Sequence, residues 1–368
     1  MSQCGLPFFA FWRCNIGILS CMKKTLFKSL VLGSIALVSC NGGDPYLRSL
    51  TIPFETIAPA DSVNLEELGI YDVRRIEKFG DFFAIANASG SHYLSLVNAK
   101  TMECRHVFRR GRGPGEAVSP SSFHKVGNQG VVYDHTTGTL VALQIEDSFE
   151  RNEAVLDTIR SFDPTKPFPP AYLTSLGDGV IAGNYLDPDV WYSYYSSDGT
   201  LTSSLPSFSY PETQGISADC AFSLMYSSLY ASNDEQNRVC VASVLCPSIS
   251  FSKMTDSGLE ELKRIELAPP VIIRADNRSM FSKESTTSFQ GISADEEFVS
   301  LLYSGKLISQ KTSPANVCNH LVQYDWDGCP VHAYRLEKGI SALCMEGNVL
   351  YGAVSCPESR LYIYELSK

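Results

Sequence analysis

The chain has 368 residues, 44% hydrophobic and 19% charged, so it carries enough apolar material for a large core, and disorder is excluded as the default. Its net charge is −10, but residues 1–40 hold four basic side chains and no acidic ones, which leaves −14 on the rest. A body this acidic should repel phosphate backbones, so nucleic acid is not an expected partner. The 18 Tyr and 19 Phe residues favour a β-rich fold.

The N-terminal 40 residues are interpreted as an export signal. From Met22 the sequence is MKKTLFKSLVLGSIALVSC, in which three lysines precede a mostly apolar, uncharged run of eleven residues, Ser29 to Ser39. A transmembrane helix needs ~20 residues, so this run better suits the apolar region of a secretory signal. We therefore expect translation to start at Met22 and residues 1–21 to be an artefact of gene assignment.

The signal ends in Leu37-Val38-Ser39-Cys40. This stretch resembles the lipobox of bacterial lipoproteins, in which the cysteine thiol receives a diacylglyceryl group and becomes the mature N-terminus. The resemblance implies that residues 1–40 are a signal region, that acyl chains on Cys40 anchor the protein in the envelope membrane, and that residues 41–45 are a short tether. Asn41 does not resemble an inner-membrane retention signal, so the outer membrane is the expected location. The alternative is an uncleaved membrane anchor.

Beyond residue 45, short runs of alternating apolar and polar residues are interrupted by Gly, Asn, Asp or Pro every eight to twelve positions. This pattern is typical of short antiparallel strands. It is clearest in the last 30 residues, where runs at 340–345, 349–355 and 361–366 are separated by turns around Gly347 and Pro357.

The strand-like runs group into repeats. Gly215-Ile216-Ser217-Ala218-Asp219 recurs at 291–295 and, in its first four residues, at 339–342. These marks and the turn-rich breaks define six units, near 70–115, 116–168, 170–212, 215–270, 290–336 and 339–366. The last unit holds only three strands, and residues 49–56 supply a candidate fourth, at an edge because of Pro53. We therefore predict an all-β fold in which residues 46–368 form one six-bladed β-propeller, its last blade completed by the N-terminal strand of the mature chain.

One stretch carries a more specific motif. Phe108 to Glu116 reads FRRGRGPGE, and Pro120, Gly130 to Asp134 and Gly138 to Val141 follow it. Together these residues resemble one NHL-type propeller repeat. The whole chain, with its lipobox and six units, resembles the uncharacterised bacterial lipoproteins with a TolB-like six-bladed β-propeller. That resemblance implies a fold and an anchor but no agreed activity.

The glycines of FRRGRGPGE allow two interpretations. A phosphate-holding loop of the GxGxxG kind must open a helix, but here the spacing is GxGxG, Glu116 would repel an anion, and β-rich sequence follows. We therefore favour a connector between two sheets. Arg109, Arg110 and Arg112 form the densest basic spot in the sequence, so they are candidate binding residues, unless they are solvated or paired with neighbouring acids.

Linear motifs for catalysis or metal binding are absent from the sequence, so no cofactor and no metal is expected. His124 and His135 lie in the unit with the best-defined strands and are candidate binding residues at the axis of a ring. Asp134 is expected to bond backbone groups in its turn. Trp191 opens the aromatic cluster Trp191 to Tyr195, which could contact a sugar ring, although packing between blades is the favoured explanation.

Two functions follow from these patterns. The first is a lipid-anchored, non-enzymatic propeller that binds a protein or glycan partner at one end of its ring. The alternative is a hydrolase or lyase for glycans or lactones, with residues that converge on the axis from several blades. Carboxylates or histidines clustered at the axis would favour the enzyme, and a channel lined with small or apolar residues would favour the platform.

Overall fold

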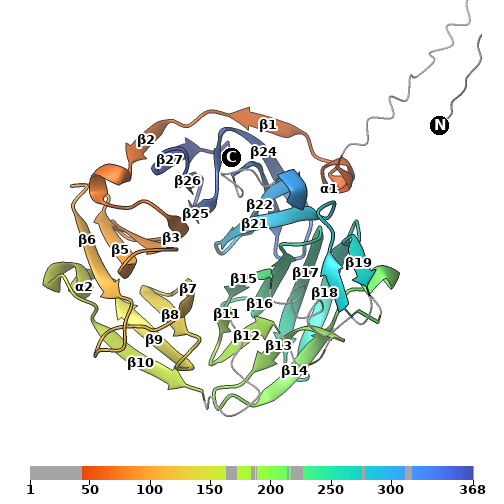
Figure 1. Ribbon diagram of the computed structural model, residues 1–368, viewed down its shortest axis with the longest axis horizontal. Coiled ribbons are helices and arrows are strands. Elements are labelled where there is room, and N and C mark those ends of the chain that lie inside the picture. The colour runs from red at the N-terminus through yellow and green to blue at the C-terminus, as the bar shows by residue number, and fades with distance from the viewer. Residues whose placement is uncertain are drawn as a thin grey trace, which may run out of the picture. The chain divides into compact units, whose positions relative to one another are not determined.

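The computed structural model describes residues 44–162, 172–183, 187, 189–213, 215–216, 227–275, 278–310 and 317–367. In these residues, antiparallel sheets stand around a common axis, and each sheet places its first strand nearest that axis (Figure 1). No helix among them is long and apolar enough to cross a bilayer.

The first three blades are four-stranded sheets in simple sequential order. Their strands, in chain order, are β3 (Val73–Phe79), β4 (Phe82–Asn87), β5 (His92–Asn98), β6 (Cys104–Arg109); β7 (Pro120–Val126), β8 (Gln129–Asp134), β9 (Thr139–Gln144), β10 (Leu156–Ser161); and β11 (Leu173–Leu176), β12 (Gly179–Gly183), β13 (Val190–Tyr195), β14 (Leu201–Pro206). Tight turns link the strands, and Gly127 and Gly177, at φ of 56°, occupy a region that side chains disfavour.

The remaining three blades continue this order. Their strands are β15 (Ser228–Asn233), β16 (Arg238–Ser243), β17 (Ser248–Thr255), β18 (Gly258–Glu266); β21 (Thr286–Ala294), β22 (Phe298–Leu307), β23 (Cys318–Asp325), β24 (Pro330–Ile340); and β25 (Ala342–Glu346), β26 (Val349–Val354), β27 (Arg360–Glu365). The predicted C-terminal runs thus correspond to β25, β26 and β27.

The last blade is completed by the N-terminal part of the chain, as predicted. The strand that does so is β2 (Asp61–Asn64), which pairs antiparallel with β27. The predicted segment 49–56 differs from the observed strand β1 (Phe54–Ile57), which adds in parallel to β24, the outer strand of the fifth blade. The N-terminal segment therefore pairs with two blades. After Pro53, β1 lies along the fifth blade and β2 along the sixth.

Six clusters of buried side chains hold the ring, one between each pair of neighbouring sheets. The cluster between the sixth and first blades packs Ala342 and Leu361 against Val73 and Phe83. The last blade therefore contacts the first, and the ring is closed. Both faces of a blade pack on neighbours, and β4, β8 and β16 are accordingly buried along nearly their whole length. The six-bladed all-β prediction is confirmed.

Several elements were not anticipated. They are α1 (Pro45–Ser49), α2 (Ile145–Arg151) between β9 and β10, the hairpin of β19 (Ile272–Ala275) and β20 (Arg278–Phe281) outside the six blades, and the short 3-10 helices η1 (Glu66–Leu68), η2 (Pro211–Thr213) and η3 (Ile308–Gln310).

The repeated GISA segment does not mark equivalent positions. Its copy at 291–294 forms the end of the inner strand β21, whereas the copy at 339–342 straddles the end of β24 and the start of β25. Most of the copy at 215–219 lies outside the described residues. The unit borders that were placed at this repeat are therefore displaced, since residue 290 lies within β21 and residue 339 within β24.

Candidate functional site

The FRRGRGPGE stretch is a connector, from the outer strand β6 of one blade to the inner strand β7 of the next. Its loop is filled from within. The Gly113 N–H donates to Oε2 of Glu116 at 2.8 Å, and a Cβ on Gly111 would lie 2.0 Å from the same oxygen. The glycines thus make room for an internal carboxylate, in the place that a bound anion would take.

The three arginines of the connector diverge. Arg109 donates from Nε to Nε2 of His92 at 3.3 Å, and Arg110 donates to the Asn87 carbonyl at 2.6 Å with its guanidinium 5.1 Å from the Tyr93 ring centroid. Arg112 is exposed. The three side chains therefore do not converge on one point.

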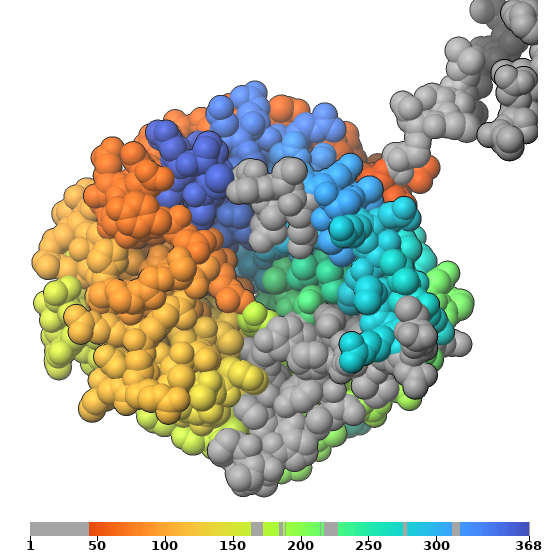
Figure 2. Space-filling model, viewed as in Figure 1, coloured from red at the N-terminus to blue at the C-terminus, as the bar shows by residue number. Residues whose placement is uncertain are grey.

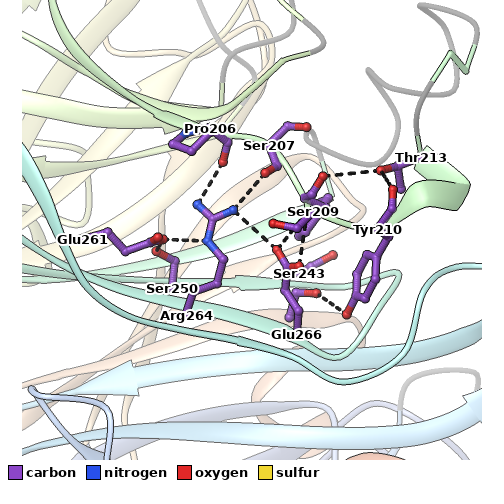
Figure 3. A network of polar contacts seen from close by, with 12 residues as sticks. Pro206, Ser207, Ser209, Tyr210, Thr213, Ser243, Ser250, Glu261, Arg264 and Glu266 are labelled. Carbon is purple, nitrogen blue, oxygen red and sulfur yellow. Dashed lines mark hydrogen bonds and ion pairs between the residues drawn. The ribbon is translucent and has the colours of Figure 1, made fainter.

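Trp191 is fully buried between the third and fourth blades. Its indole N–H donates to Ser228 at 3.0 Å, and the Arg264 guanidinium covers its ring at 5.6 Å. Arg264 in turn donates to the carbonyls of Pro206 and Ser207 and to Glu261, in the polar network that ties β14 to β18 (Figure 3). Packing between blades thus explains the aromatic cluster, and Trp191 offers no exposed ring face to a sugar.

His135 and Asp134 lie in the β8–β9 turn, away from the inner strands. Asp134 accepts hydrogen bonds from the backbone N–H groups of Val118, Ser119 and Thr136, which confirms the structural role expected for it. His135 is exposed beside it.

His124 is the one predicted candidate that lies at the axis. It projects from the inner strand β7 toward the inner strand β11, where the Ser175 N–H donates to its Nε2 at 3.1 Å. The Ser175 hydroxyl lies 2.9 Å from the same nitrogen. Burial, with the Arg75 guanidinium nearby, lowers the pKa of His124 from 6.5 to about 3, so the ring is neutral at neutral pH.

The tautomer of His124 follows from these contacts. Because Nε2 accepts a backbone N–H, the single proton of the neutral ring lies on Nδ1. Nδ1 is buried and has no partner among the described residues, although the side chain is only 5% exposed. A buried donor without an acceptor is costly, so this N–H is a place where an oxygen atom of a bound molecule would be favourable.

Two cavities meet at His124, Arg75 and Tyr230. The first, here called the arginine cavity, has a volume of about 280 Å³ and is lined by Arg74, Arg75, Tyr93, Ser121, Ser122, Phe123, His124, Tyr172, Leu173, Ser227, Ser228, Leu229, Tyr230 and Val244. The second, the acidic mouth, has about 410 Å³ and reaches the turns after the inner strands. The space-filling view shows a hollow near the middle of the ring (Figure 2).

The two cavities differ in charge. The described lining of the arginine cavity holds two arginines and no carboxylate. Arg75 is tied through Nε to Glu77 at 2.8 Å, and the exposed Arg74 lies over the Tyr172 ring at 5.2 Å. The acidic mouth holds three basic and six acidic side chains, among them Glu346 and Glu296. On an acidic body, the arginine cavity is therefore a local site for an anion or for oxygen acceptors.

Groups of three or more His, Cys, Asp or Glu side chains that could hold a metal ion are not found among the described residues. Glu77, one of the six acidic side chains in the described lining of the acidic mouth, is engaged by Arg75. The arginine cavity can thus bind a polar ligand, and the carboxylates that an acid–base mechanism would need lie in the acidic mouth beside it.

Comparison with known proteins places the fold. Residues 53–348 match the family model of TolB-like 6-blade propeller-like proteins. The chain belongs to this TolB-like family. None of the curated proteins compared with it matches.

Solved structures resemble this TolB-like propeller at low sequence identity. A member of the DUF4221 family from Bacteroides vulgatus is 10% identical with a TM-score of 0.53, over 84% of this chain and 97% of that one. A candidate exported protein from Bacteroides fragilis is 10% identical (TM-score 0.48; 86% and 100% covered). BamB from Moraxella catarrhalis is 11% identical (0.38; 85% and 98%). At these identities the first of them supports the fold alone.

The sequence reasoning missed Arg75, Glu77 and Tyr230 of the TolB-like propeller. A signal for Arg75 and Glu77 was present, because the two oppositely charged residues alternate on one face of the inner strand VRRIEKF. In a propeller, the first strand of every unit lines the axis, so charged residues there deserve priority as site candidates.

Proposed function

We propose that this TolB-like propeller is a lipid-anchored envelope protein that binds a protein or glycan partner at the arginine cavity without transforming it. The observation that supports the binding site is the cavity itself, which is lined by Arg74 and by the Glu77-paired Arg75, and in which His124 leaves a buried donor unused. The lipobox at Cys40 supports the anchor, and the family membership is compatible with an envelope location.

The first described residues support a short connection to the membrane. Asp44 caps α1 by accepting from the Tyr46 and Leu47 N–H groups, and its other oxygen accepts from the Tyr303 hydroxyl at 2.7 Å. Tyr46 is fully buried against Phe289 between the fourth and fifth blades. Cys40 precedes Asp44 by four residues, which span at most ~14 Å. Acyl chains on Cys40 would therefore hold that rim of the ring close to the bilayer.

The six carboxylates in the described lining of the acidic mouth favour the alternative enzyme, whereas His124 does not. A hydrolase or lyase needs a general acid or base near its working pH. His124, with its pKa near 3 and its Nε2 occupied, is poorly suited to that task. Turnover of a glycan or lactone that survives purification, and that is lost in an Arg75 or Glu77 variant, would overturn the non-enzymatic proposal.

Anchoring is tested by substitution of the cysteine. Cys40→Ala should abolish metabolic labelling with an acyl-chain analogue and leave the signal uncleaved, because no thiol remains to form the thioether. Cys21→Ala is the matched control and should be labelled normally, since it lies before the expected start at Met22. Normal labelling of Cys40→Ala would contradict the anchor.

Binding at the arginine cavity is tested by cross-linking in the native envelope and by a glycan array with the purified protein. Arg74→Glu should reduce the yield of a specific partner by at least about tenfold, because it replaces a cation at the cavity entrance by an anion. Arg112→Glu makes the same charge change in the connector and should not. Equal loss in both variants, or loss only in Arg112→Glu, would place the binding surface elsewhere.

A further inference from the structure

We propose that the arginine cavity recognises a carboxylate on a compact apolar body, through the Arg75 guanidinium and the Nδ1–H of His124. This inference rests on the proposed function, because it names the chemistry that the same cavity takes. Neither residue recognises the ligand alone, since the neutral histidine supplies a directed donor and the arginine supplies the charge.

The histidine is fixed as a donor by the neighbouring blade. The Ser175 N–H and hydroxyl hold its Nε2, so the ring cannot turn to use Nδ1 elsewhere without releasing a backbone N–H. The same strand pair is pinned a second time, where the Leu173 N–H donates to the Ser122 hydroxyl at 2.9 Å. The ring is therefore fixed before any ligand arrives, and because Nδ1 is enclosed in this structure, a ligand oxygen reaches it only as the side chains over it move.

The arginine retains its binding edge. Its Nε donates to Glu77, and none of the described residues accepts a hydrogen bond from its two terminal nitrogens. Those two nitrogens form the edge of the guanidinium fork that pairs with both oxygens of a carboxylate. The Glu77 ion pair orients the fork and leaves that edge available to a ligand.

The charge and the walls of the cavity narrow the ligand class. The charge of Arg74, beside an Arg75 that is already paired with Glu77, suits a monoanion, whereas a phosphate dianion is usually met by more cations or by a helix N-terminus. Phe123, Leu229 and Val244 supply apolar surface beside these donors. A volume of about 280 Å³ lies at the lower end for ligand cavities, so it fits one compact group.

This chemistry has two sources, namely a free small carboxylic acid or the C-terminal residue of a peptide. Calorimetry on the full-length protein in detergent would compare N-acetyl-L-phenylalanine and benzoate with N-acetyl-L-phenylalaninamide, glucuronate and inorganic phosphate. We expect at least one of the two apolar carboxylates to bind at least tenfold more tightly than the amide, glucuronate and phosphate. Preference for N-acetyl-L-phenylalanine assigns the peptide C-terminus, and preference for benzoate assigns the free acid.

Two variants locate the binding. His124→Gln keeps an acceptor for the Ser175 N–H in its Oε1 but removes Nδ1–H, and it should weaken carboxylate binding at least fivefold. The Arg75→Gln/Glu77→Gln pair removes the charge without leaving a carboxylate unpaired, and it should abolish the preference for carboxylate over amide. Arg112→Gln is the control and should bind as the unaltered protein does. Circular dichroism checks that each variant is folded.

Tight binding of the amide or phosphate, or unchanged carboxylate binding in both axial variants, would overturn the inference. That failure is distinguishable from failure of the proposed function. If the Arg74-dependent partner is still captured while no carboxylate binds, only the ligand chemistry is wrong.

Discussion

At the scale of single residues, polar side chains of this protein fill sites that resemble ligand sites. The Glu116 carboxylate occupies the loop whose glycines suggested a phosphate site. His124 differs from Glu116, because only one of its ring nitrogens is used within the protein. Its Nε2 accepts a hydrogen bond from the neighbouring inner strand, whereas its Nδ1 has no partner among the described residues. Residue type alone does not separate these cases, since both depend on which backbone groups lie within reach.

The buried state of His124 predicts a pH dependence of stability. Its pKa is about 3 in the folded protein and 6.5 for an unburied group, so the unfolded chain binds the proton first as the pH falls. The contribution of neutral His124 to the free energy of unfolding is thus fully present above pH 6.5. It declines as the pH falls from 6.5 to 3, by up to about 1.4 kcal/mol per pH unit. Urea denaturation of the unaltered protein and of His124→Gln at pH 7.5, 5.5 and 4.5 measures how the difference in their free energies of unfolding depends on pH. A difference that does not change with pH would contradict it.

At the scale of elements, the outer strands of the third and fourth blades are joined by hydrogen bonds from one arginine to backbone carbonyls. Arg264 of β18 reaches Pro206 and Ser207, at and just after the end of β14, and is held by Glu261 and Glu266 of its own strand. Its side chain is only 13% exposed. An ion pair this enclosed is costly to break, because the remaining partners are left buried and unpaired.

We therefore expect Arg264→Ala to lower the free energy of unfolding by about 3 kcal/mol, because it removes the cation from two carboxylates and the donor from two carbonyls. Arg360→Ala is the matched control. Its pair with Glu358 is largely solvated, so a loss of at most about 1 kcal/mol is expected. Urea denaturation of both variants measures the difference, and equal losses would show that the network between β14 and β18 adds no stability.

At the scale of the whole molecule, the ring is closed by pairing across the ends of the chain. The strand β2 supplies the outer strand of the last blade, and β1 covers the outer edge of the fifth. These pairings satisfy backbone groups of β27 and β24 that would otherwise be exposed, and the short strands β1 and β2 become the outermost strands.

Replacement of β2, Asp61–Asn64, by four Gly and Ser residues should lower the free energy of unfolding by about 2–4 kcal/mol, since each replacement gives up roughly 0.5–1 kcal/mol of strand preference and packing. The same replacement in β19, Ile272–Ala275, should cost less than half as much, because that hairpin lies outside the six blades. Thermal unfolding with limited proteolysis measures both. Equal effects would argue that β2 is not needed for closure.

Blade number, the C-terminal strands and the connector role of FRRGRGPGE were all predictable from the amino-acid sequence. Each depends on a local signal, namely a turn glycine such as Gly127, an apolar run such as 349–354, or the absence of a helix after a glycine loop. Local signals survive without knowledge of neighbours, because they reflect backbone sterics and side-chain periodicity within one strand or turn.

The exact partner of each N-terminal strand and the axial site were decided only by tertiary structure. Residues 49–64 contain two short strands, and no local feature of their sequence shows which of them pairs with β27. Arg75 and His124 are 49 positions apart and His124 lies 51 positions from Ser175, so only the closed ring brings them together. The protonation and hydrogen bonding of His124 depend on its burial and on a backbone N–H from another blade. Neither feature can be read from the sequence around His124.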